Sequence, residues 1–72
     1  MKKYILTKTD CDFPIGSTMF LDEKGNAYVV YEGEHPRGYN NSIVEFEGRA
    51  YQTYGFPWVL LKVFGYEAKE EK

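Results

Sequence analysis

The sequence has a single cysteine, Cys11, so it can form no internal disulfide and offers no second thiolate for a structural zinc site. Long apolar runs are also missing. The segment of residues 1–8 has only three consecutive apolar or aromatic residues, too few for a signal peptide or a membrane-spanning helix. We therefore expect a cytoplasmic protein in a reducing compartment, with no membrane contact.

The sequence also lacks an excess of positive charge. Nine basic and eleven acidic residues give a net charge of −2, so no long-range positive field attracts a polyanion. Arg49 and Lys62 are the only basic residues near the aromatic segments, which is too few for a groove that follows a phosphate backbone. The charge thus argues against nucleic acid as a partner.

No complete catalytic or metal-binding pattern is present. Asp10 and Asp12 flank Cys11, but a calcium loop needs further oxygen ligands at fixed intervals, which do not follow here, so we expect a polar bend. Cys11 and His35 are the strongest candidates for a nucleophile and a base, yet their spacing does not bring them together. We expect Cys11 to be a small, partly buried apolar group. We predict that the protein is not an enzyme and uses no cofactor and no metal.

Glu45 and Glu47 lie two residues apart in an expected strand. Side chains with this spacing share one face of a strand about 7 Å apart, a separation that also suits paired-carboxylate hydrolysis. No sugar-stacking platform or groove can be inferred around them. We expect them to keep this face solvated and to discourage strand-to-strand aggregation.

Aromatic residues are abundant. Seven Tyr, five Phe and one Trp make up 18% of the chain, and each such ring can bury roughly 150–250 Å². β-branched and aromatic residues fill the segments between glycines, and no window has a clear apolar repeat of three to four residues, so we expect strands. The expected strands are residues 3–7, 17–22, 27–31, 42–47, 50–54 and 58–64, with tight turns at 23–26 and 47–49.

These strands predict an all-β fold. We expect a small five- or six-stranded antiparallel meander that forms a partly open SH3-like barrel, with an OB-like barrel as the second choice. Residues 1–66 are expected to form a single β domain. Residues 67–72 are charged and lack an apolar face, so we expect a frayed C-terminal tail.

Two segments have the residue types that dominate protein–protein contacts. One is the polar loop of residues 34–41, and the other is the aromatic segment of residues 54–58, where an exposed ring would mark an interface. Arg, Tyr and Trp are enriched among residues that contribute most to binding energy. The predicted partner-binding residues are His35, Arg37, Tyr39, Asn40, Tyr54, Phe56 and Trp58.

The leading hypothesis is a small non-enzymatic module that binds another protein, as an inhibitor or accessory factor acting on a host protein. A short chain rich in Tyr, Lys and Glu with a charged tail is similar in style to the small accessory proteins of bacteriophages and low-GC bacteria; this resemblance covers no motif. One alternative is a structural subunit that forms a homodimer through the apolar segment of residues 58–64. A nucleic-acid or nucleotide binder ranks third on charge grounds.

Overall fold

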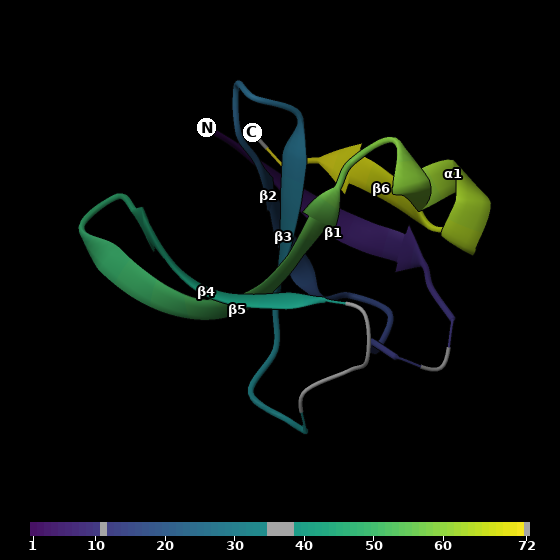
Figure 1. Ribbon diagram of the computed structural model, residues 1–72, viewed down its shortest axis with the longest axis horizontal. Helices are drawn as coiled ribbons and strands as arrows, with labels where there is room; N and C mark the ends of the chain where they lie inside the picture. Colours follow the sequence, from purple (N-terminus) through teal and green to yellow (C-terminus); the bar gives the residue numbers. More distant parts are fainter. Residues whose placement is uncertain (11, 35–38, 72) are drawn as a thin grey trace.

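Short strands make up much of the chain, as its content of aromatic and β-branched residues predicts. The computed structural model describes residues 1–10, 12–34 and 39–71. Within these residues it has one antiparallel sheet of six strands and one short helix (Figure 1). The prediction of a small all-β antiparallel fold is confirmed. The elements are β1 (Lys2–Lys8), β2 (Thr18–Leu21), β3 (Asn26–Val30), β4 (Asn40–Phe46), β5 (Arg49–Pro57), α1 (Leu60–Phe64) and β6 (Glu67–Glu70).

The sheet has the strand order β4-β5-β3-β2-β1-β6, and every neighbouring pair is antiparallel. Strands β1, β2 and β3 follow one another as a meander. The β4–β5 hairpin joins the sheet through β5, which places β4 at one edge and β6 at the other. In the described part of the chain these two edge strands do not pair with each other, so the sheet is open.

Local turn chemistry explains both predicted hairpins. The Asp22 carboxylate accepts a hydrogen bond from the backbone N–H of Asn26 at 2.9 Å, and Gly25 has a φ of 89°, which closes the turn between β2 and β3. Between β4 and β5, Glu47 and Gly48 have φ values of 50° and 79°. A two-residue hairpin turn of type I′ requires positive φ at both positions. Both predicted turns are confirmed.

The predicted strand at residues 58–64 is wrong, because this segment forms a turn followed by α1. Gly65 ends the helix with a φ of 79°, and its backbone N–H donates to a carbonyl of the last turn at 3.1 Å. Leu61 and Phe64 pack against the core, whereas Val63 is exposed. A run that is apolar at both odd and even positions is typical of a buried strand. In a short helix, however, only some of its side chains need to face the core, and the others stay exposed.

The second correction concerns the charged C-terminal segment. Residues 67–72 are expected from the sequence to fray, but β6 forms here and pairs antiparallel with β1. Ion pairs join these strands at both ends: Lys3 with Glu71 at 3.4 Å, and Lys8 with Glu67 at 3.7 Å. All four side chains of β6 are exposed. The strand is therefore held by its backbone ladder and by complementary charge rather than by an apolar face.

Apolar side chains are buried on both faces of the sheet. Successive strand residues point to opposite faces, so Met19 and Phe20 belong to different cores. Met19 packs with Leu6 and a cluster of rings in what we call the main core. Phe20 lies in a second core, with ring centroids 4.9 Å from Phe46 and 5.2 Å from Tyr51. Figure 1 shows the curved β4–β5 hairpin, which contributes these last two rings, reaching away from α1.

Candidate functional site

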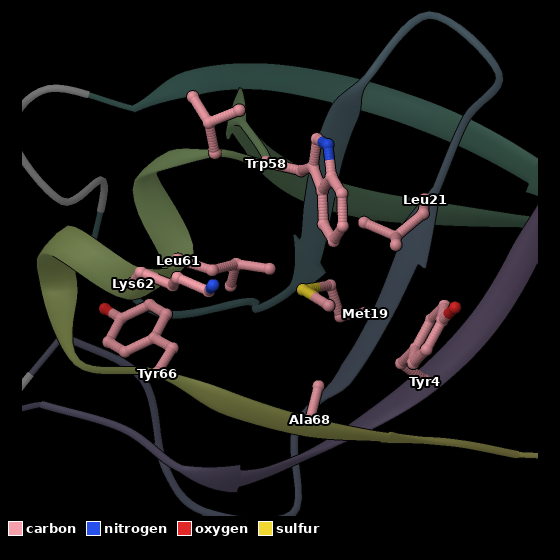
Figure 2. A pocket seen from close by; sticks show the side chains of 9 residues that line it. Tyr4, Met19, Leu21, Trp58, Leu61, Lys62, Tyr66 and Ala68 are labelled. Atoms are coloured by element: carbon pink, nitrogen blue, oxygen red, sulfur yellow. The ribbon is translucent and has the colours of Figure 1, made fainter.

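An open, largely apolar cavity lies where α1 faces the sheet, beside the indole of Trp58 (Figure 2). Its volume is about 400 Å³, which is within the range of small-molecule and side-chain binding pockets. We call this cavity the Trp58 groove. It is lined by Tyr4, Met19, Leu21, Trp58, Val59, Leu61, Lys62, Tyr66 and Ala68.

Strand geometry builds the floor of the Trp58 groove. Met19 and Leu21 are two residues apart on β2, so they share a face, and Met19 pairs with Tyr4 of β1. On the other side of β1, Ala68 of β6 pairs with Leu6. The single methyl group of Ala68 fills little of the space above its strand. Three neighbouring strands, β2, β1 and β6, thus form one continuous apolar floor.

The turn before α1 and the helix itself form the wall. The backbone N–H of Trp58 donates to the carbonyl of Gly25 at 2.9 Å, which ties this turn to the β2–β3 turn. A β-carbon at Gly25 would lie 3.6 Å from Cδ1 of Trp58, so the indole lies against this glycine. After the helix, the backbone N–H of Tyr66 donates to the carbonyl of Leu61 at 2.8 Å. Backbone hydrogen bonds therefore fix both ends of the wall.

Large apolar side chains stay exposed around this wall. Trp58 is 48% exposed, Val59 is 67% exposed and Val63 is 75% exposed. None of the three is fully buried, so packing in the main core does not account for their apolar character. An exposed cluster of large apolar residues beside an apolar cavity is typical of an interaction surface.

A second cavity of about 380 Å³ adjoins the Trp58 groove. The two cavities share Tyr4, Leu21 and Trp58. The second is more polar, because Lys2 and Glu23 are among its lining residues. The two cavities are adjacent, so an extended occupant of the Trp58 groove would have further surface to contact beside it.

Buried tyrosines next to the groove hydrogen-bond the two carboxylates that the sequence places in a polar bend. The hydroxyl of Tyr66 donates to Oδ1 of Asp10 at 2.6 Å, and the hydroxyl of Tyr39 donates to Oδ2 of Asp12 at 3.2 Å. The two hydroxyls lie 3.2 Å apart. Asp10 and Asp12 thus act as acceptors for core tyrosines, and these contacts fix the β1–β2 connection above the main core.

The environment of this cluster shifts the pKa of both tyrosines. Burial raises the pKa of Tyr66 above its ordinary value of 10.0, and the hydrogen bond to Asp10 raises it further. Burial also raises the pKa of Tyr39, against the opposing effect of its hydrogen bond with Tyr66. Both hydroxyls therefore stay protonated in the folded chain at a pH at which unfolded tyrosines ionise.

Folding stability is expected to fall as the pH rises above about 10. The unfolded state then releases tyrosine protons that the folded state keeps, and each such group lowers the free energy of unfolding by up to about 1.4 kcal/mol per pH unit. Urea denaturation between about pH 9 and pH 11 measures this slope. Tyr66→Phe should flatten it, and Ile43→Ala on the exposed surface of β4, which removes no ionisable group, should not. The same slope in both variants would contradict this assignment.

The structure places the predicted partner-binding residues in different environments. Tyr39, Tyr54 and Phe56 are buried in the main core, so their rings do not form a contact surface, which corrects the prediction for these three. Asn40 is exposed at the start of β4, and Trp58 is half-exposed at the Trp58 groove. His35 and Arg37, like Cys11, lie outside the described residues. Among the predicted residues that the structure describes, Trp58 alone lines the groove.

Sequence reasoning missed most of the groove. Tyr4, Leu21 and Tyr66 come from three separate segments, and no local pattern shows that they meet. Lys62 and Leu61 were missed because the segment around them was assigned to a strand. An apolar spacing of three to four residues, from Trp58 to Leu61 and on to Phe64, could have indicated the helix.

The expected pair of strand carboxylates is not formed. Glu45 lies exposed in β4, but Glu47 lies in the following turn, with a φ of 50°, so the two do not share a strand face. The turn needs a residue with positive φ here, and this requirement overrides the alternating pattern.

Among the described residues, no group of three or more His, Cys, Asp or Glu side chains could hold a metal ion. No helix within the described ranges has the length and apolar character needed to cross a membrane. No protein-family model, curated protein or solved structure matches the chain.

Proposed function

We propose that this protein is a non-enzymatic protein-binding module that holds an apolar segment of a partner in the Trp58 groove. The observation that carries this proposal is the half-exposed indole of Trp58 at the side of an apolar cavity. Tryptophan is the residue type most enriched at binding hot spots, where its large ring is covered on complex formation. By occupying a surface of its partner, such a module acts as an inhibitor or an accessory factor.

The chemistry of the groove supports binding by apolar contact. Its described lining is mostly aliphatic and aromatic, and Lys62 is its one charged member. Val59 lines the groove and is 67% exposed, and Val63, four residues further along the same segment, is 75% exposed. Covering this area would remove apolar surface from water, at roughly 25 cal/mol for each Å². The partner should therefore present a large aliphatic or aromatic side chain.

Affinity capture from a lysate of the source cells, read by quantitative mass spectrometry, tests this proposal. Trp58→Asp should reduce the retained partner by at least about tenfold, as expected when a hot-spot residue is lost. Ile43→Asp is the matched control. Ile43 is 65% exposed on β4, the edge strand at the opposite end of the strand order from β6. Equal retention by all three proteins would show that the Trp58 groove is not the binding surface. Thermal melts check that both variants fold.

A second candidate is self-association through the same surface. The sequence predicts this contact through a strand at residues 58–64, and in the structure a turn and α1 take the place of that strand. The exposure of Trp58, Val59 and Val63 on one short segment still favours a contact between copies. Sedimentation at micromolar concentration separates the two candidates. A doubled mass that Trp58→Asp returns to the monomer mass would support self-association.

A further inference from the structure

Lys62 is the feature of the Trp58 groove that the proposed function does not use. Among the described residues, it is the only charged side chain that lines the groove. Figure 2 shows its amine on the groove side of α1. The described part of the chain contains two ion pairs, one with Lys3 and one with Lys8, and Lys62 belongs to neither. An ammonium group without an ion-pair partner thus stands beside an apolar cavity.

We infer that the Trp58 groove recognises an acidic peptide segment, in which a large apolar side chain lies close to an Asp or Glu side chain. The apolar side chain packs beside Trp58, and the carboxylate pairs with Lys62. This inference rests on the proposed function, because it specifies the chemistry of the segment that the groove binds. Apolar walls exclude water from part of the contact, which strengthens an ion pair formed at their rim.

The shape of the site favours an internal segment of a polypeptide. The second cavity adjoins the groove at Tyr4, Leu21 and Trp58, so an extended chain has further surface to contact. The charged residues of that cavity are Lys2, Asp22 and Glu23, so the acidic side chain is expected at the Lys62 end of the segment. Terminal carboxylates are usually captured by several backbone N–H groups in a nest. Here the positive group is one flexible ammonium on a five-residue helix, which suits the side chain of Asp or Glu.

Selection from a displayed library of random linear peptides tests this inference. Four baits are compared: the native chain, Lys62→Glu, Lys69→Glu and Trp58→Asp. Lys69 is the matched control because it is exposed on β6 and pairs with Ile5, on the face opposite to Ala68. The native chain and Lys69→Glu should enrich Asp or Glu at a fixed spacing from a large apolar residue. Lys62→Glu should enrich Lys or Arg at that position.

The affinity of one selected synthetic peptide gives the size of the effect. Lys62→Glu should weaken binding roughly tenfold, because charge reversal replaces a partly screened attraction with a repulsion of similar size. Lys69→Glu should leave the affinity within about twofold of the native value. Thermal melts of both variants confirm that they fold.

The outcomes distinguish this inference from the proposed function. If the native chain enriches apolar peptides without acidic residues, or if Lys62→Glu keeps the acidic preference, the inference is wrong and the groove remains a peptide site. If no bait enriches any peptide, the proposed function fails, and the inference fails with it. Enrichment that Trp58→Asp does not abolish would place the binding outside the Trp58 groove and would overturn both.

Discussion

Replacing Phe13 with alanine is expected to remove a large fraction of the free energy of unfolding of this chain. Phe13 is only 2% exposed, and its ring makes edge-to-face contacts with Tyr31, Tyr39 and Tyr66 at centroid distances of 5.4, 5.2 and 6.3 Å. Removing a buried phenylalanine ring costs about 3–5 kcal/mol. At roughly 0.05–0.15 kcal/mol per residue, this chain is expected to have a total stability of about 4–11 kcal/mol. The substitution therefore removes a large fraction of it.

Urea denaturation followed by far-ultraviolet circular dichroism measures this loss for Phe13→Ala. Phe13→Leu is the matched control, because it keeps an apolar side chain of similar volume and should cost about 1–2 kcal/mol. A loss below about 1 kcal/mol for Phe13→Ala would show that the β1–β2 connection does not cover the main core.

Phe20→Ala is expected to destabilise the chain by a similar amount, about 3–5 kcal/mol, through a separate set of contacts. Phe20 is fully buried against Phe46 and Tyr51 on the face opposite to the main core. The guanidinium carbon of Arg49 lies 4.9 Å from the centroid of the Tyr51 ring and covers this second core. Without Phe20, the curved β4–β5 hairpin loses its main anchor to β2.

Hydrogen exchange locates the effect of Phe20→Ala, and urea denaturation measures its size. Backbone amides in the ladder between β4 and β5 should exchange faster in the variant, beyond the change that global destabilisation predicts. Ile43→Ala is the control, because Ile43 is 65% exposed on β4 and should change stability by less than about 0.5 kcal/mol. If Phe20→Ala lowers the free energy of unfolding no more than Ile43→Ala does, the second core contributes nothing to stability.

Turns were the part of the fold that the sequence predicted best. The β2–β3 turn depends on Asp22 and Gly25, and the β4–β5 turn on Gly48, and each acts within a few residues. Such local chemistry can be inferred from neighbouring residues alone. The all-β class follows from the strands that these turns connect.

Two elements depended on contacts that neighbouring residues do not determine. The segment before Gly65 forms a helix because only one of its sides meets the core. Val63 is apolar but exposed, so the sequence around it does not show which side that is. Strand β6 forms because Lys3 and Lys8 of β1, far away in the sequence, offer a ladder and opposite charge to the acidic C-terminal segment. In both cases tertiary context overrides local propensity.

The candidate site shows the same limit. Trp58 was predicted as a contact residue from its type and its aromatic segment; the structure leaves it half-exposed, and its contact role stays a prediction. Tyr39 and Phe56 were chosen on the same grounds, but the main core buries them. Residue type does not reveal on which side of a sheet a ring lies. The groove itself joins β1, β2, α1 and β6, and only the assembled sheet brings these elements together.

Fluorescence of Trp58, the only tryptophan of the chain, tests most directly whether this groove binds a partner segment. The native protein is titrated with a peptide selected by the display experiment, while calorimetry measures the binding independently. A covered indole should shift its emission to shorter wavelength and become protected from acrylamide, with both changes saturating at the calorimetric stoichiometry. Unchanged emission and quenching at full saturation would contradict the account, because the peptide would then bind away from Trp58.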